Sequence, residues 1–221
     1  MADFHQHGRV ATLHNLRTTQ TEDLEAQLVE FSEHKKIWVI LPCLYSELEG
    51  EAMPRIRKEL AAVPYIDHIV IGLDKATETQ FESAKAFFSE LPQEHSILWN
   101  DGQRLKSIDA HLANATLAPR EIGKGRNVWY CFGYALACGR ADVVALHDCD
   151  ILTYRREMLA RLLYPVCHPN FSYQFCKGYY PRVASGTLNG RVNRLLVTPL
   201  LHALSELFGH LDYLTYLKSF R

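Results

Sequence analysis

Two aspartates, Asp148 and Asp150, stand one residue apart directly after Asp142 to His147, an apolar run with the length of a buried strand. Ligands of open α/β sheets bind beyond the carboxyl ends of the strands, which is where this pair falls. In extended backbone, residues i and i+2 face the same way, so both carboxylates can converge on one cation. Their hard oxygen atoms suit Mg²⁺ or Mn²⁺, ions that commonly also hold substrate phosphates. The alternative is that both carboxylates only cap the next helix.

A second cluster precedes that strand, in Gly123-Lys124-Gly125 at the start of a predicted helix. Glycine allows close backbone approach to a ligand, a helix N-terminus favours anions, and Lys124 adds a mobile positive charge. The segment is not a P-loop, because the chain has no G-x-x-x-x-G-K-[ST] motif. Such a segment alone is often an ordinary loop, but its place just before the Asp pair predicts a phosphate contact.

Polar side chains also follow the first two apolar runs. The turn at residues 42–47 reads Pro-Cys-Leu-Tyr-Ser-Glu, and a carboxylate or hydroxyl there could bind a ribose or a base edge. Equally, Ser46 could cap a helix whose first turn contains Glu47. Asp74, after the second apolar run, has the same two interpretations.

A basic loop, residues 189–193, leads into the last predicted helix. The charge of Arg191 opposes the helix dipole at a helix start, which favours an anionic partner. Its guanidinium and the neighbouring backbone N–H groups predict a cradle for phosphate or carboxylate. The alternative is an ordinary surface arginine.

Strands and helices alternate along the chain. Apolar runs of strand length are separated by segments with helical spacing, which predicts βαβ units and a doubly wound, mostly parallel sheet in one α/β domain. The predicted strands are residues 37–42, 68–73, 96–99 and 142–147, and the predicted helices are 52–63, 76–91 and 127–138. Beyond them we expect strand or hairpin over 171–183, a loop over 186–190, and a helix over 191–208 despite Pro199.

Composition excludes several classes of protein. The 221 residues carry a formal net charge of -1, which removes any expectation of broad electrostatic binding to nucleic acid or acidic membranes. The six cysteines form no C-x-x-C pair and mostly lie in apolar runs, so we expect free thiols in a reducing, cytoplasmic compartment. No apolar stretch reaches the roughly 18 residues of a membrane span, and the N-terminus lacks the apolar core of a signal peptide.

The chain divides into two parts of unequal size. Residues 1–35 are predicted as a polar N-terminal extension with one short helix around Leu24 and Leu28. Residues 36–221 are predicted as the α/β domain. Because the chain stops on an apolar segment at Arg221, we expect this domain to be incomplete at its C-terminus.

Five ordered pieces of sequence resemble the glucosyl-3-phosphoglycerate synthase family of GT-A-fold glycosyltransferases. They are LPCLYSE, VIGLD, GKGRNVWY, VVALHDCD, and FCKGYYPR together with NGRVNRLLVTPLL. The resemblance runs from about Ile37 to the end. It implies a nucleotide-diphospho-sugar transferase that moves glucose from UDP-glucose to the 2-hydroxyl of 3-phosphoglycerate with retention, using Mg²⁺ or Mn²⁺. The implied partners are the nucleotide sugar and phosphoglycerate.

The resemblance also implies residue roles. It assigns donor binding to Pro42, Leu44, Glu47, Asp74, Lys124 and Asp148, metal binding to Asp148 and Asp150, and acceptor binding to Gly190, Arg191 and Asn193. Ser46 stands where the family has an acidic residue, and Asn193 where it usually has Thr. Related enzymes continue with a segment that supplies a metal-binding His, and no catalytic residue is assigned in this chain.

Three other functions remain open on the sequence. One is a related transferase that uses GDP-mannose or another acceptor. Another is a catalytically silent nucleotide-sugar-binding domain, or a subunit that forms a homodimer through its apolar C-terminal helix. The last is a nucleotidyltransferase, which normally has a Gly-rich loop after the first strand, whereas LPCLYSE contains no glycine.

Overall fold

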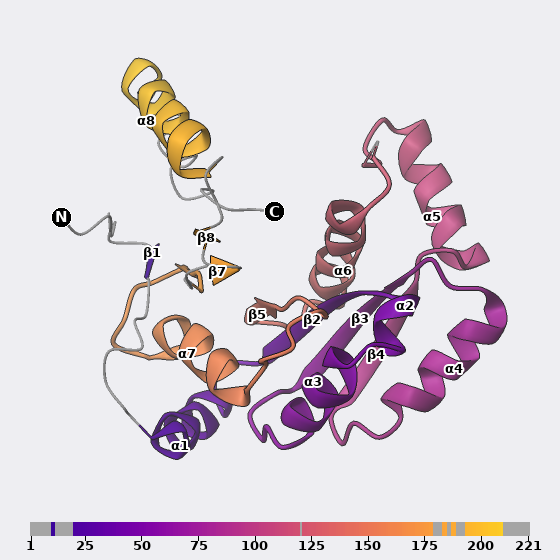
Figure 1. Cartoon of the computed structure of the whole chain (residues 1–221), viewed down its shortest axis with the longest axis horizontal. Coiled ribbons are helices and arrows are strands. Elements are labelled where there is room, and N and C mark those ends of the chain that lie inside the picture. The colour runs from indigo at the N-terminus through magenta and orange to yellow at the C-terminus, as the bar shows by residue number, and fades with distance from the viewer. Residues whose placement is uncertain are drawn as a thin grey trace.

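The computed structural model describes residues 10–11, 20–119, 121–178, 183–184, 187–188 and 193–209. At its centre, four parallel strands form a sheet in the order β4–β3–β2–β5 (Figure 1). They are β2 Ile37–Leu44, β3 His68–Asp74, β4 Glu94–Trp99 and β5 Val143–Leu146. The chain runs outward from β2 to β4 and then returns to place β5 on the other side of β2. The predicted doubly wound sheet is therefore confirmed, with its switch point between β2 and β5.

Helices cover both faces of this sheet (Figure 1). They are α1 Thr21–Ser32, α2 Tyr45–Leu48, α3 Ala52–Ala61, α4 Glu78–Phe88, α5 Gln103–Asn114, α6 Lys124–Cys138 and α7 Arg156–Cys167. On one face, α6 packs against β2 and β3. On the other, α1, α3, α4 and α7 contribute to a larger core, in which Leu28 of α1 is fully buried. The predicted helix near the N-terminus thus packs against the α/β core.

Alternation along the strands divides the side chains between these two cores. Trp38 and Ile40 face α6, where they pack with Cys131. Val39 and Leu41 belong to the larger core on the opposite face. Because both faces are covered by helices, the central strands β2 and β3 are mostly apolar, which is why they were visible in the sequence, whereas the edge strand β4 begins with Glu94, His95 and Ser96.

Short elements follow the main sheet. β1 Val10–Ala11 pairs in parallel with β6 Phe175–Cys176, and β7 Val183–Ala184 pairs antiparallel with β8 Thr187–Leu188. Within the described part of 171–183, the predicted strand or hairpin is thus β6 with a distant partner and the start of β7. The predicted loop over 186–190 is wrong at Thr187–Leu188, because these residues pair with β7.

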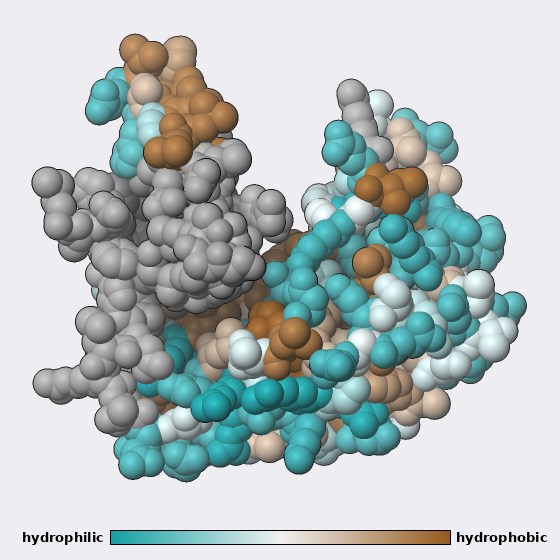
Figure 2. Space-filling view, viewed as in Figure 1, coloured by the Kyte–Doolittle hydropathy of each residue, from teal (hydrophilic) through white to brown (hydrophobic). Residues whose placement is uncertain are grey.

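The predicted helix over 191–208 is confirmed for its described residues. A π-helical turn, η1 Asn193–Val197, leads into α8 Thr198–Leu207. Pro199 lies in the first turn of α8, where a missing N–H costs no intrahelical bond. Figure 2 shows apolar surface gathered over α8, whereas most of the visible face below it is hydrophilic. The exposed apolar residues of this segment are Leu195, Leu196, Leu200, Leu207 and Phe208.

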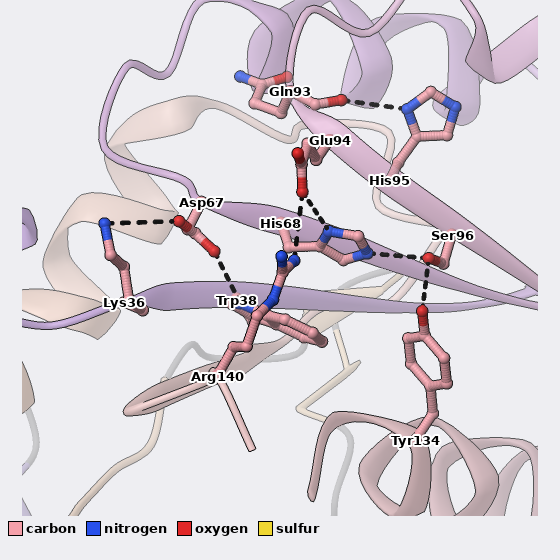
Figure 3. Close-up of polar contacts among 10 residues, drawn as sticks. All are labelled: Lys36, Trp38, Asp67, His68, Gln93, Glu94, His95, Ser96, Tyr134 and Arg140. Carbon is pink, nitrogen blue, oxygen red and sulfur yellow. Dashed lines mark hydrogen bonds and ion pairs between the residues drawn. The ribbon is translucent and has the colours of Figure 1, made fainter. Parts of the chain in front are cut away.

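A polar network joins the amino ends of the strands to α6 (Figure 3). His68 Nε2 lies 3.0 Å from Ser96 Oγ, which lies 2.9 Å from Tyr134 Oη on α6. The His68 ring stacks on Trp38 at 4.4 Å, and its Nδ1 lies 3.6 Å from the Glu94 carboxylate. Burial is the main cause that lowers the pKa of His68. This network lies at the edge of the sheet opposite the carboxyl ends.

Two expectations from composition can be compared with the structure. All six cysteines are free thiols, as expected. Among the described residues, no helix combines the length and the apolar character that crossing a bilayer requires.

Candidate functional site at the switch point

The Asp pair leaves the sheet on one side because the alternation of β5 continues past its last residue. His147 N–H donates to Ile40 O at 3.1 Å, which prolongs the pairing with β2. His147 and Cys149 are buried, whereas Asp148 is half-buried and Asp150 is exposed. Because Cys149 and Asp150 lie in a turn, the extended geometry behind the i, i+2 prediction ends at Asp148, and the convergence of the two carboxylates stays a prediction.

His147 is held away from this acidic pair. Its ring packs edge-on against Tyr154 with centroids 5.2 Å apart, and its Nε2 is buried without a hydrogen-bond partner. Burial lowers the pKa of His147 to about 4, so the ring is neutral near pH 7. This histidine therefore belongs to the core and offers nothing to a cation held by the aspartates.

Lys124 reaches the Asp pair from the start of α6. Its Nζ donates a hydrogen bond to Asp148 Oδ1, and both side chains remain partly exposed. No side chain caps the N-terminus of α6, so its first backbone N–H groups point outward without an intrahelical acceptor. An open hollow of about 510 Å³ lies there, lined by residues 121–126 and Pro119. The helix end thus combines a cation, free N–H donors and space for an anion.

Gly123 sets the direction in which α6 begins. Its φ of 154° and ψ of -169° lie in a region that only glycine adopts without strain. Its C=O accepts the first hydrogen bond of the helix, from Asn127 at 3.1 Å. The glycine expected near a phosphate contact therefore also has a backbone role.

Asn127 anchors α6 on the sheet. Its Nδ2 donates to Gly72 O at 2.7 Å in the middle of β3. A Cβ on Gly72 would lie 1.8 Å from Asn127 Oδ1 and 2.6 Å from Cys131 Sγ, so this close approach requires glycine. This contact fixes where α6 begins along the sheet, and so where Lys124 lies relative to the carboxyl ends of the strands.

The turn after β2 is closed by Glu47. The Leu44 N–H donates to Glu47 Oε2 at 2.7 Å, and α2 begins at Tyr45. Ser46 therefore lies inside the helix, and its interpretation as the N-cap is wrong, because a glutamate in the first turn already satisfies the preceding backbone. Glu47 keeps its second carboxylate oxygen for other contacts.

Four of the predicted donor-binding residues lie at the carboxyl ends of β2 and β3 or just after them. Leu44 is the register partner of Asp74, and Pro42 is the partner of Gly72. Asp74 is buried, and its Oδ1 accepts the N–H of Lys75 at 3.1 Å. Together with Glu47, these residues lie at the carboxyl edge of the sheet, the edge from which the loop after β5 carries Asp148 to Lys124.

The predicted acceptor loop lies mostly outside the described residues. This applies to Gly190 and Arg191. Asn193 begins η1, and only its backbone is described. The structure therefore leaves the acceptor-binding assignment as a prediction.

A group of possible metal ligands at the same edge of the sheet was missed in the sequence. The ligand atoms of Cys43, Glu47 and Cys149 all lie within 4.8 Å of one another; we call this group the thiol site. The hydrogen bond with Cys43 and burial raise the pKa of Cys149 well above its usual range. No C-x-x-C spacing marks the pair, because its members come together only through the pairing of β2 with β5.

The fold defines a structural class. A doubly wound sheet with the Asp pair at its switch point has the architecture of GT-A nucleotide-diphospho-sugar transferases. In solved structures it resembles glucosyl-3-phosphoglycerate synthase from Mycobacterium tuberculosis in complex with Mn²⁺, UDP and glucosyl-3-phosphoglycerate. The TM-score is 0.56 at 20% identity, covering 90% of this chain and 59% of that one. The same enzyme with Mn²⁺ and UDP-glucose also gives 0.56, at 19% identity over 91% and 58%.

The sequence comparison points to one kind of transferase within that class. The chain is 46% identical over 221 residues to glucosyl-3-phosphoglycerate synthase of Persephonella marina, covering 100% of this chain and 55% of the relative. It is 33% identical over 222 residues to the synthase of Methanococcoides burtonii, covering 99% and 54%. The chain is therefore a homologue of these synthases and spans about half the length of the curated relatives it matches. No family model matches it.

Proposed function

We propose that this chain forms the donor-binding part of a retaining glucosyltransferase that moves glucose from UDP-glucose to 3-phosphoglycerate. The observation that carries the proposal is the 46% identity to a synthase of that name over the whole chain. The geometry supports it, because a cation, free N–H groups and an acidic pair converge at the switch point of the sheet.

The donor lies, in this proposal, along the carboxyl ends of β2, β3 and β5. Leu44 and Pro42 provide apolar contacts for the uracil, and Glu47 and Asp74 accept hydrogen bonds from the base and ribose. Lys124 and the first N–H groups of α6 bind the diphosphate. The side chain of Lys124 exchanges Asp148 for a phosphate oxygen when the donor enters.

Asp148 and Asp150 hold a Mg²⁺ or Mn²⁺ ion, with Asp150 as the direct ligand. The donor set fits such an ion in its chemistry, since two hard carboxylates one residue from each other are both accessible to solvent. The bound ion neutralises the charge that develops on the departing UDP. The residues of this chain orient the donor and its leaving group. We assign acceptor binding to Gly190, Arg191 and Asn193, whose basic loop suits the phosphate of phosphoglycerate.

Calorimetry with UDP-glucose, with and without Mn²⁺, tests the donor site directly. We expect binding that depends on Mn²⁺ and that is lost in Asp150→Asn. Glu33→Gln, an exposed acid on the far side of the chain's core, is the matched control and keeps the affinity. A folded chain that binds no UDP-glucose in either condition overturns the proposal, and equal binding by Asp150→Asn overturns the metal assignment.

The same samples separate the alternatives. Glucose transfer to 3-phosphoglycerate, measured with labelled donor, distinguishes a transferase from a silent binding domain, which binds donor and forms no product. Tighter binding of GDP-mannose than of UDP-glucose selects a related transferase. Arg191→Ala is expected to weaken phosphoglycerate far more than the donor, and equal effects on both reject the acceptor role.

The remaining proposals concern association and location. The exposed apolar residues of η1 and α8, such as Leu196 and Leu200, suit burial between two copies, so we propose a homodimer through this segment. Light scattering of the chain and of Leu200→Ser tests this, since a monomer in both rejects it. The free thiols support a reducing, cytoplasmic compartment, and the net charge of -1 gives no support for nucleic-acid binding.

A further inference from the structure

The two sulfur atoms of the thiol site are buried, whereas the neighbouring Asp pair reaches solvent. Cys43 and Cys149 belong to the larger core beneath the sheet. Asp148 is half-buried and Asp150 is exposed, whereas Cys149 between them is buried. The protein therefore presents two chemically different ligand sets within one loop, one hard and one soft.

Strand register places the two thiols together. Ile40 pairs with Leu146, and the His147 N–H continues the ladder to Ile40 O at 3.1 Å. Cys43 and Cys149 each lie three residues beyond that last pair, at equivalent positions on neighbouring strand ends. The Sγ atoms of Cys43 and Cys149 lie within 4.8 Å of each other, and Cys43 Sγ donates to Leu44 O at 3.2 Å. This positioning is carried by backbone pairing, so it does not rely on a mobile loop.

Glu47 completes the group from α2. Its Oε2 is occupied by the Leu44 N–H, which orients the carboxylate. Glu47 is also less buried than the two thiols, each of which is 1% exposed. Glu47 is therefore the ligand that solvent reaches, and the two sulfur atoms lie deeper in the protein.

We propose that the thiol site binds one Zn²⁺ ion through Cys43 Sγ, Cys149 Sγ and a carboxylate oxygen of Glu47. Thiolate sulfur selects borderline and soft ions such as Zn²⁺ and Cd²⁺ over Mg²⁺ or Mn²⁺. Three protein ligands with a water in the fourth position make a common tetrahedral zinc site. Each thiol releases its proton to the solvent as it becomes a thiolate ligand.

The distances permit this coordination with little movement. At a Zn–S distance of about 2.3 Å, two sulfurs of a tetrahedral site lie about 3.8 Å apart. The three ligand atoms already lie within 4.8 Å of one another, so they approach by about 1 Å or less on binding. Zn²⁺ bound there would link the end of β2 and the start of α2 to the loop after β5.

Titration of the metal-free, reduced chain with Cd²⁺ tests the proposal, because Cd²⁺ bound to thiolate absorbs in the ultraviolet. We expect one equivalent of Cd²⁺ to produce this absorption, Zn²⁺ to displace it, and Mn²⁺ at the same concentration to leave it unchanged. Cys43→Ser and Cys149→Ser are expected to lose the absorption. Cys138→Ser, which removes an exposed thiol elsewhere, is the matched control and keeps it.

The outcomes distinguish Cd²⁺ binding at the thiol site from binding to any accessible cysteine. Circular dichroism establishes that each variant is folded. If a serine variant does not fold, Glu47→Gln carries the test, with a Cd²⁺ affinity reduced by about tenfold or more. No absorption from the folded chain, or absorption that survives the loss of either thiol and of Glu47, overturns the proposal. Asp150→Asn is expected to keep Cd²⁺ binding, and Cys43→Ser and Cys149→Ser change no residue assigned to the donor, so these variants test the two proposals separately; Glu47→Gln touches both.

Discussion

Lys124 Nζ donates a hydrogen bond to Asp148 Oδ1 and so joins the first residue of α6 to the loop that follows β5. The two side chains are 44% and 41% exposed. An ion pair this exposed contributes roughly 0–1 kcal/mol to stability. In the proposed donor site, exchange of this pair for a phosphate on Lys124 and a dication on Asp148 would therefore cost little.

Lys124→Met removes this charge while it keeps most of the side-chain volume. We expect UDP-glucose to bind about 10- to 100-fold more weakly, because a charge-assisted hydrogen bond contributes about 1.5–3 kcal/mol. Calorimetry in the presence of Mn²⁺ measures the loss. Lys106→Met, on the exposed face of α5, is the control and keeps the affinity. An unchanged affinity in Lys124→Met removes this residue from the donor site.

Gly72→Ala tests how α6 is anchored on β3. The new Cβ would lie 1.8 Å from Asn127 Oδ1 and 2.6 Å from Cys131 Sγ, so α6 must shift. We expect the free energy of unfolding to fall by about 1–3 kcal/mol, as for other overpacked cores. Urea unfolding measures it. Gly133→Ala in the same helix meets nothing within 4 Å and is expected to leave stability equal or higher by up to about 1 kcal/mol.

Gly123→Ala addresses the start of α6 without any steric clash, since nothing lies within 4 Å of the added Cβ. The cost comes from the backbone, whose φ of 154° is strained for alanine by about 1–3 kcal/mol. We expect weaker UDP-glucose binding along with lower stability, because the first N–H groups of the helix turn away. Gly125→Ala, which has equal space and no such φ, is the control. Identical behaviour of the two variants contradicts the backbone role of Gly123.

The His68 network predicts a loss of stability in acid. Burial and the charge of Arg140 lower the pKa of His68, and Glu94 and Asp67 oppose this shift. Below the ordinary histidine pKa of about 6.5, the unfolded chain therefore binds a proton that the folded chain does not. The stabilising contribution is complete above that pH and is lost as the pH falls toward the lowered folded-state value.

Urea unfolding as a function of pH measures this effect. In His68→Gln, which can still contact Ser96 but does not titrate, we expect a shallower fall in the free energy of unfolding below pH 6.5. His147 is also buried, so part of the fall remains. The exposed His111→Gln is the control and keeps the full pH dependence. An unchanged slope in His68→Gln means that His68 keeps its ordinary pKa in the folded chain.

The main sheet was predictable because β2 and β3 are buried on both faces and therefore appear as nearly continuous apolar runs, and β5 is a short apolar run that is half-buried on one face. Helix α5 was missed although Leu105, Ile108 and Leu112 recur at helical spacing, a short stripe of which no residue is buried. Helix α7 contains Pro165, a residue that argues against a helix from sequence alone. Its Leu159 and Leu163 nevertheless pack into the larger core, so tertiary contacts overcome that preference.

The candidate site was predictable in part for a different reason. The Asp pair and Lys124 carry charges that are unusual at strand and helix ends, so their positions alone indicate chemistry. Cys43 and Cys149 follow the apolar residues of their strands and carry no charge that marks them in the sequence. Only the register between β2 and β5 brings them together. Register between strands that are distant in sequence is a tertiary property, which local spacing does not reveal.

The alternation between Val143 and Asp150 constrains how this loop can vary in length. One residue inserted after Leu146 would turn Cys149 toward solvent and drive the Asp148 carboxylate into the core, where unpaired charge is costly. Two inserted residues would restore every side chain to its original side. We therefore expect the segment between Leu146, the last paired residue of β5, and Asp148 to tolerate the insertion of two residues and to reject the insertion of one.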